Sequence, residues 1–223
     1  MLQHINALKM QALQTQMNPH FIFNVLSSIQ DLIVDEKNKE ALLYIARFAK
    51  LIRFIFEKSS ELTIPIAQEI KFIQLYLELE QLRFHQKIDI QLNISPSLLD
   101  GDQLVPPLLI QPILENSFKH GLMHKEKGGS LSLVLHEKDN GIYCCVEDNG
   151  VGRIKANEYT KWKNQNINSN RTSGLVVTQK RLDILSQETN CPSNFLITDL
   201  MNEKQEPVGT KTEFLIPFNS KFF

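Results

Sequence analysis

Asp148-Asn149-Gly150-Val151-Gly152 places an acid and two glycines directly after a stretch of alternating apolar residues. Glycine is favoured where the backbone turns tightly or lies close against a ligand. The pentapeptide therefore has two interpretations. It is either an ordinary turn between strands, which Asp-Asn-Gly commonly forms, or a loop against which a nucleotide base docks.

A predicted helix upstream carries polar side chains on one face. It reads Leu114-Glu115-Asn116-Ser117-Phe118-Lys119-His120-Gly121, and Asn116, Lys119 and His120 fall at positions i, i+3 and i+4. An amide oxygen suits Mg²⁺, which takes oxygen ligands and keeps several waters. Lys119 or His120 can meet phosphate oxygens. The alternative interpretation is a solvated helix face.

Two further segments downstream carry groups that suit a nucleotide. Ser173-Gly174-Leu175 stands at the start of a predicted helix, where backbone N–H groups can hold phosphate oxygens. Gly209-Thr210-Lys211-Thr212 begins the last predicted strand and puts two hydroxyls on one face, able to bond a base or a bridging water. Threonine is also an ordinary strand residue, which is the alternative.

Residues 1–86 have the apolar spacing of helices and form the first predicted domain, with Pro19 and Pro65 as the interior breakers. A helix after Pro65 is apolar on two sides, and we expect a second copy of the chain to cover one of them. The spacing of a coiled-coil seam is kept by Leu42, Ile45, Ala49, Ile52 and Phe56. Helical packing and dimerisation are therefore expected in this half.

Residues 87–223 form the second predicted domain, because the apolar period changes from 3.6 to 2 at Lys87–Ile94. The polar stretch 153–173 is expected to be a long mobile loop of the kind that often acts as a lid. Further strands are predicted near residues 130–138, 141–148, 194–200 and 211–217, with a helix near 175–187. The fold class is therefore α+β, with helices on a mixed sheet.

Composition excludes several classes of protein. The 223 residues are 42% hydrophobic, and 24 Lys and Arg nearly balance 25 Asp and Glu, so the basic field of a dedicated nucleic-acid binder is missing. The three cysteines include the adjacent Cys144 and Cys145, which indicates no disulfide framework and favours a reducing, cytoplasmic compartment. No apolar run approaches the roughly 18 residues that span a bilayer, so the chain as given is expected to be soluble.

The four segments that begin at Leu114, Asp148, Ser173 and Gly209 resemble, in order and spacing, the N, G1, G2 and final-strand Thr motifs of the GHKL ATP-binding fold. The resemblance implies an α/β sandwich that binds Mg²⁺ and ATP. Asp148 would accept a hydrogen bond from the adenine amino group, Asn116 would bind the metal, and Gly150, Gly152 and Gly174 would shape the pocket and lid. By the same resemblance, nucleotide binding would also involve Lys119, His120, Leu175, Thr210 and Thr212.

The segment Gln16-Met17-Asn18-Pro19-His20-Phe21-Ile22-Phe23-Asn24 resembles the phosphoacceptor signature of the LytS/YehU class of sensor kinases. Gln111-Pro112 ahead of Glu115-Asn116 resembles the N box of the same class. The likeness extends from about residue 10 to 217. It implies an ATP-dependent histidine kinase of a two-component system, in which His20 of a homodimer is phosphorylated and the phosphoryl group passes to an aspartate of a LytTR-type response regulator. A neutral imidazole is a competent nucleophile near pH 7.

Membrane segments in this class lie upstream of the kinase portion. The resemblance therefore implies that this chain is the cytoplasmic portion of an inner-membrane sensor, with contact to the membrane only through segments before residue 1. No nucleic-acid partner is expected.

Two departures from the family pattern leave alternatives open. Many histidine kinases carry an acid directly after the phosphoacceptor, whereas Phe21 stands here, so the base is unassigned, with Glu115 and Asn24 as candidates. In the G2 segment Thr172 replaces a glycine and Val177 an asparagine, although Arg181-Leu182 keeps the family's ending. A dimeric interaction module that binds nucleotide with weak catalysis is therefore the alternative function. An ATP-hydrolysing machine of the chaperone or mismatch-repair type ranks last, because such proteins lack the Asn-Pro-His element.

Overall fold

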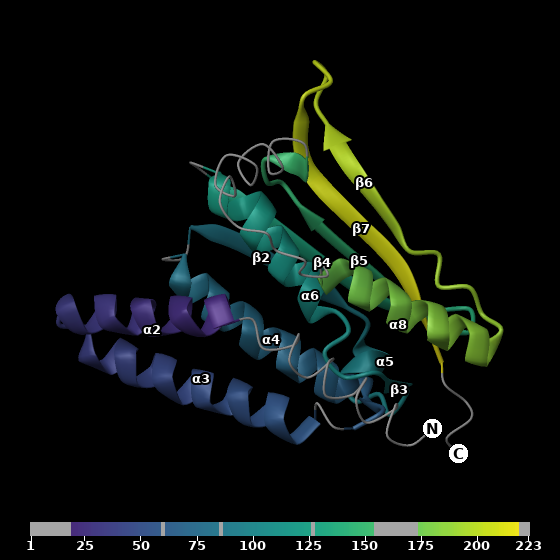
Figure 1. Cartoon of the computed structure of the whole chain (residues 1–223), viewed down its shortest axis with the longest axis horizontal. Helices are drawn as coiled ribbons and strands as arrows, with labels where there is room; N and C mark the ends of the chain where they lie inside the picture. Colours follow the sequence, from purple (N-terminus) through teal and green to yellow (C-terminus); the bar gives the residue numbers. More distant parts are fainter. Residues whose placement is uncertain (1–18, 59–60, 85–86, 126–127, 154–173, 219–223) are drawn as a thin grey trace.

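The computed structural model describes residues 19–58, 61–84, 87–125, 128–153 and 174–218 (Figure 1). Its helices are α2 (Pro19–Val34), α3 (Asn38–Lys58), α4 (Ile66–Arg83), α5 (Pro96–Leu99), α6 (Gln111–Asn116), the π-helical η1 (Ser117–Gly121), the 3-10 helical η2 (Leu122–His124) and α8 (Gly174–Thr189). Its strands are β1 (Ile64–Pro65), β2 (Ile88–Ile94), β3 (Leu104–Val105), β4 (Gly129–Lys138), β5 (Gly141–Asp148), β6 (Leu196–Met201) and β7 (Pro207–Pro217). The α+β class with a mixed sheet, predicted from the sequence, is confirmed.

Helices α2, α3 and α4 pack together through aromatic side chains. The ring of Phe21 lies 6.3 Å from that of Phe48 and 5.5 Å from that of Tyr76, measured between centroids. The Tyr44 hydroxyl, fully buried, donates a hydrogen bond of 3.1 Å to the carbonyl oxygen of Leu79 and so ties α3 to α4. Helix α2 begins at Pro19, a residue that suits the first helical position because its missing N–H would have no partner there.

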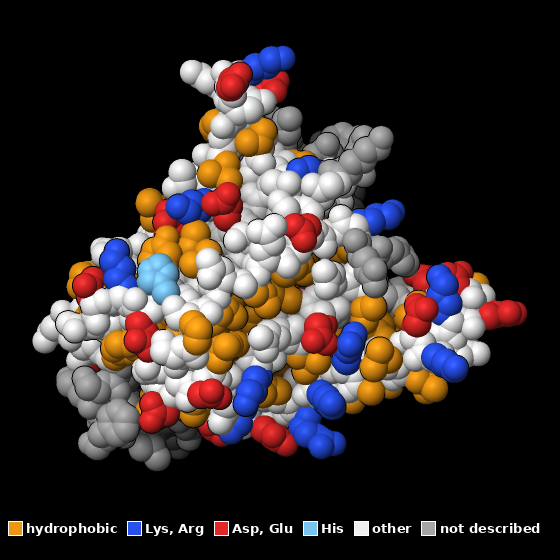
Figure 2. Space-filling model, turned by 180° about the vertical axis from the view of Figure 1, so that it is seen from behind, with side chains coloured by type: hydrophobic (Ala, Val, Ile, Leu, Met, Phe, Trp, Pro, Cys, Tyr) orange, Lys and Arg blue, Asp and Glu red, His pale blue; other side chains and the backbone are white. Residues whose placement is uncertain are grey.

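The predicted seam of α3 remains uncovered in the single chain. Leu42 and Phe56 are 67% and 66% exposed and Ile45 is 42% exposed, whereas Leu51 and Ile55 of the same helix are buried. Figure 2 shows hydrophobic side chains at the surface toward the end of the molecule where α2 and α3 lie. This apolar surface is available for a partner.

The expectation that a second copy covers α4 is wrong. Ile70, Ile73 and Leu77 on one side of this helix and Phe72 and Leu79 on the other are all buried within the single chain. The helix lies between the α2–α3 pair and the sheet half of the same chain (Figure 1). Covering both sides within one chain explains why its apolar surface is so wide.

The main sheet has five strands in the order β2-β4-β5-β7-β6. Strands β2 and β4 run parallel, and the other neighbours are antiparallel. Helices α4, α6 and α8 cover one face (Figure 1), and β4, β5 and β7 bury alternate residues. The buried residues at these alternate positions are Leu131, Leu133, Leu135, Ile142, Cys144, Val146, Phe214 and Ile216.

The elements occur close to where the residue pattern predicts them, including the helix through Gly121 and the strands that flank the Lys138–Gly141 turn. The predicted lid at 153–173 lies, after Arg153, outside the described residues, and the domain boundary at residue 86 stays a prediction. The search for a membrane-crossing helix, made over the described residues, finds none of sufficient length and apolarity.

A buried acid on α4 holds the loop that leads into α6. The side chain of Glu69 is fully buried. Its two oxygens accept hydrogen bonds from the backbone N–H groups of Leu108 at 2.8 Å, Leu109 at 2.9 Å and Ile110 at 3.3 Å. Buried backbone donors are costly to leave unpaired. This one side chain therefore stabilises the loop by accepting hydrogen bonds from three successive backbone N–H groups.

Helix α8 binds the carbonyl oxygens of the same loop. The guanidinium of Arg181 donates to the carbonyl oxygens of Pro107 at 2.7 Å and Leu108 at 3.4 Å. Leu108 has a φ of +56°, a conformation that costs free energy for a residue with a branched side chain. The loop is therefore held in a strained shape by α4 and α8 together.

Replacing Glu69 by Ala should destabilise the fold by about 3–5 kcal/mol, because three buried N–H groups and Arg181 lose their acceptor or counter-charge. Urea unfolding measures the change. Glu78→Ala is the matched control on the same helix, and its half-exposed side chain predicts a loss of under about 1 kcal/mol. Equal losses for both variants would contradict this account of the loop.

Candidate functional site

Asp148, the last residue of β5, is a buried carboxyl at the centre of the predicted nucleotide site. Its side chain is 2% exposed. Oδ1 accepts a hydrogen bond from the N–H of Gly150 at 2.9 Å, and the carboxyl also accepts from the Ser117 hydroxyl and the Thr210 N–H. Burial raises the pKa of Asp148, and these three hydrogen bonds oppose that rise. The carboxyl is fixed in position by three different segments.

Glycines allow the backbone of these segments to meet around Asp148. A Cβ on Gly150 would lie 2.3 Å from the Cα of Gly121, and one on Gly209 would lie 2.1 Å from the Asp148 carbonyl oxygen. The N–H of Val151 donates to the Gly121 carbonyl oxygen at 3.3 Å. Any side chain at these positions would push the segments apart, so the close approach of the backbones explains why glycine occupies them.

The rest of the loop after β5 is tied to its neighbours. The amide of Asn149 accepts from the N–H of Ser130 at 2.8 Å and donates to the Gly128 carbonyl oxygen at 3.2 Å. Gly152 has a φ of +76°, which a glycine adopts without strain. The structure therefore supports a loop with a fixed shape rather than a simple surface turn.

The predicted metal- and phosphate-binding residues lie on one continuous helical segment beside Asp148. Asn116 ends α6 and is half-buried, while Lys119 and His120 lie in η1, where Lys119 is exposed and His120 half-buried. Burial is the main cause that lowers the pKa of His120, followed by the charges of Lys119 and His124. His120 is therefore neutral near pH 7, so Lys119 is the cation here.

The remaining predicted residues surround this segment. Gly174 begins α8, where an added Cβ would lie 3.1 Å from Cβ of Pro112 on α6, and Leu175 follows it half-buried. On β7, Thr210 pairs with Asp148 in the strand register, and Thr212 is buried. Three motifs thus meet at Asp148, and the described start of the fourth lies against α6. Thr172 and Ser173 of the G2 segment lie outside the described residues.

The phosphoacceptor segment packs against the same helical segment, at a cavity that Lys119 also lines. His20 is the second residue of α2, and its side chain lies outside what the structure describes. The next residue, Phe21, and Asn24, one turn on, line a small cavity that α2 shares with α4 and with the α6–η1 segment. The other lining residues are Glu80, Arg83, Glu115, Phe118, Lys119 and Met123.

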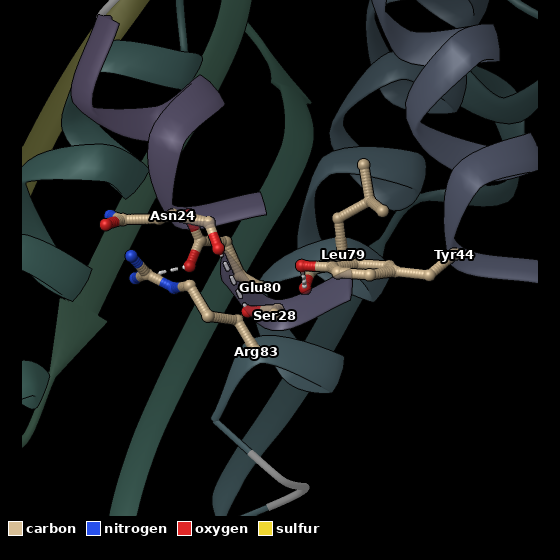
Figure 3. Close-up of polar contacts among 6 residues, drawn as sticks. All are labelled: Asn24, Ser28, Tyr44, Leu79, Glu80 and Arg83. Atoms are coloured by element: carbon tan, nitrogen blue, oxygen red, sulfur yellow. Dashed lines mark hydrogen bonds and ion pairs between the residues drawn. The ribbon is translucent and has the colours of Figure 1, made fainter. Parts of the chain in front are cut away.

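Glu80 is the residue of this cavity that sequence reasoning missed. It is 2% exposed and forms an ion pair of 2.5 Å with Arg83, and Figure 3 shows the Asn24 side chain beside this pair. Burial is the main cause that raises the pKa of Glu80 to about 7; Glu115 adds to the rise and Arg83 opposes it. A signal was present, because Glu80 continues the apolar stripe of Ile73 and Leu77, a position where an acid is unusual.

Sequence reasoning also missed Ser117, Gly121 and Gly209, which contact Asp148. Ser117 and Gly121 belong to the quoted helix segment, but their importance arises from contacts with residues distant in sequence. Asn24 and Glu115, the two residues that the sequence offered as candidates for the base, both line this cavity.

Comparisons with known proteins give one consistent result. Residues 8–88 match the family model described as histidine kinase. The chain is 29% identical over 218 residues to the sensor protein LytS of Oceanobacillus iheyensis, covering 95% of this chain and 35% of that protein. It is 30% identical over 216 residues to the sensor protein LytS of Staphylococcus epidermidis, covering 95% and 34%. The chain therefore spans about a third of the length of these curated relatives.

Among solved structures, the catalytic domain of the histidine kinase ThkA is 14% identical to this chain. The match covers 70% of this chain and 96% of that one, with a TM-score of 0.43.

The buried Glu80 predicts a pH dependence of stability. Its folded pKa of about 7 lies above the ordinary 4.5, so the stability it contributes is full below pH 4.5 and is lost as the pH rises through 7. The loss amounts to about 3 kcal/mol. Glu80→Gln should remove this pH-dependent part of the stability. Urea unfolding at about pH 5 and about pH 8 should then give a smaller difference in the free energy of unfolding than in the wild type. An unchanged profile in this variant, alongside Glu78→Gln as control, would contradict the assignment.

Proposed function

We propose, on the premise that the chain belongs to the LytS class of sensor histidine kinases, that it binds ATP in its C-terminal half and phosphorylates His20. The observation that carries the proposal is the buried carboxyl of Asp148, fixed among glycines where η1, the loop after β5 and strand β7 meet. A fixed acceptor in a buried site favours a ligand that donates a hydrogen bond there, as the adenine amino group does.

The phosphates and metal would lie over the α6–η1 segment. The amide oxygen of Asn116 would bind Mg²⁺, and the exposed Lys119 would meet phosphate oxygens, while His120 contributes as a neutral hydrogen-bonding group. Among the described residues no group of three or more His, Cys, Asp and Glu side chains converges to hold a metal. Such a group would not be needed here, because Asn116 would hold the Mg²⁺ by its amide oxygen and the ion commonly keeps several waters.

Phosphoryl transfer needs chiefly position and charge neutralisation. In the proposed reaction a ring nitrogen of His20 attacks the γ-phosphorus in line with the leaving oxygen of ADP. The phosphoryl group then passes to an aspartate of a response regulator, for which we propose the LytTR type. Gly174 and Leu175 at the start of α8, a helix of 16 residues, support the phosphate side of the site.

A homodimer would cover the exposed apolar residues of α2 and α3. Large apolar patches on a soluble protein commonly mark association surfaces. The exposed residues concerned are Phe23, Leu26, Ile33, Leu42, Ile45 and Phe56. We also propose that this portion works in the cytoplasm, where ATP and response regulators are found, as the kinase part of an inner-membrane sensor.

The alternative of a nucleotide-binding module with weak catalysis rests on Thr172 and Val177 alone. Membership of the histidine kinase family does not favour it.

Labelling with γ-labelled ATP and Mg²⁺ tests the proposal. We expect a label that is acid-labile and alkali-stable, lost in His20→Gln and lost or strongly reduced in Asp148→Asn. Asp148→Asn should also weaken ATP binding by at least about tenfold, because the charged acceptor becomes a neutral amide whose NH2 group meets donors of Gly150, Ser117 or Thr210, whereas His20→Gln should bind ATP normally.

His136→Gln is the control for the labelling experiment, because this half-buried histidine packs against Tyr143, away from Asp148. It should keep the label. A wild-type chain that binds ATP without taking label would favour the interaction module, and a label that persists in His20→Gln would place the chemistry at another residue.

A further inference from the structure

The small cavity between α2, α4 and the α6–η1 segment holds groups that the proposed reaction has not yet used. Its volume is about 10 Å³, close to the room that one water molecule needs, and its walls carry several polar groups that could bond a water. Two of its lining residues, Glu80 and Glu115, are carboxylic acids. The following inference rests on the proposed phosphorylation of His20.

The helical spacing of α2 puts His20 next to this cavity. Phe21 and Asn24 both line it, and in the sequence of α2 His20 directly precedes Phe21 and stands one turn before Asn24. Phe21 itself is 8% exposed and packs on Tyr76, so the position after the phosphoacceptor serves the core. An acid that assists His20 must therefore come from another element.

Glu80 is the better placed of the two acids because it is fixed. Arg83 holds its carboxylate at 2.5 Å, and both side chains are nearly buried, at 3% and 13% exposure. The Tyr44–Leu79 hydrogen bond anchors α4 at the preceding residue (Figure 3). Glu115, by contrast, is half-buried and next to the predicted metal ligand Asn116.

We propose that Glu80 is the proton acceptor for the phosphorylation of His20, directly or through one water in the cavity. One ring nitrogen of His20 forms the N–P bond while the bond from the γ-phosphorus to the ADP oxygen breaks. The proton on the other ring nitrogen passes to the Glu80 carboxylate, which leaves a neutral phosphohistidine, ADP and a protonated Glu80. The proton then leaves to solvent.

The charges around Glu80 fit this role. Arg83 faces it from α4 and keeps part of the acid ionised, Glu115 faces it from α6 and makes it more basic, and Tyr76 lies beside it on α4. Lys119 of η1 lines the same cavity. The resulting pKa of about 7 is close to the value at which a general base works best at neutral pH.

Single-turnover labelling at saturating ATP tests the role of Glu80. Glu80→Gln should slow phosphorylation of His20 by at least about 100-fold, the usual range for loss of a general base, with ATP affinity unchanged. Glu115→Gln, the competing candidate, should lose less than tenfold, as should the exposed control Glu78→Gln. Wild-type rates in Glu80→Gln, or a larger loss in Glu115→Gln, would overturn the proposal.

Chemical rescue separates chemistry from structure. Glu80→Ala removes the carboxylate and opens space, so added formate should restore its rate by at least about tenfold, since a small carboxylate can replace the missing base. A purely structural role predicts no rescue, and that result would count against the proposal. A wild-type chain that takes no label would instead overturn the proposed function itself.

Should Glu80→Gln fail to bind ATP, Glu80→Asp decides the question. This variant keeps a carboxylate but withdraws it by one methylene group, so kcat should fall while KM for ATP stays the same. Equal kcat values for Glu80→Asp and the wild type would overturn the proposal.

Discussion

The carboxylate of Glu69 is the interaction on which the rest of the structure depends. It satisfies three backbone donors of the loop before α6, and Arg181 holds the carbonyl side of the same loop. The loop fixes where α6 begins, and α6 carries Asn116 and leads to Gly121. The position of the site is therefore set jointly by a helix from the N-terminal half and one from the C-terminal half.

The α6–η1 segment is a wall shared by two compartments. Ser117 and Gly121 contact Asp148 on the nucleotide side. Glu115, Phe118 and Lys119 line the cavity that receives Phe21 and Asn24 from α2. Because the helical α6–η1 segment lies between the nucleotide site and α2, the distance between them depends on the side chains packed on this segment. It does not depend on the conformation of a loop.

Sequence reasoning succeeded where a pattern lies within one segment. Residue alternation correctly located β2 and the β4–β5 hairpin. Three of the four motifs meet around Asp148, and Gly174 of the fourth lies against Pro112 on α6. It failed where a residue's role depends on a partner far along the chain, because neither period nor local motif reports such contacts. Glu69 looks like an ordinary helix acid, and the close approach of the Gly121 and Gly150 backbones cannot be read from either segment alone. The second side of α4 was misassigned for the same reason, since an apolar stripe does not say whether its cover is the same chain or another.

The π-helical turn η1 has a consequence for how such a site can change over time. A π turn contains one residue more than the α turn it replaces, and each helical residue turns the chain by about 100°. Loss of one residue between Ser117 and Gly121 would therefore restore an α-helix and leave the segments on either side in nearly the same orientation. Such a deletion would change the spacing of the side chains within the turn, Lys119 and His120 among them, while the ends of the segment keep their places.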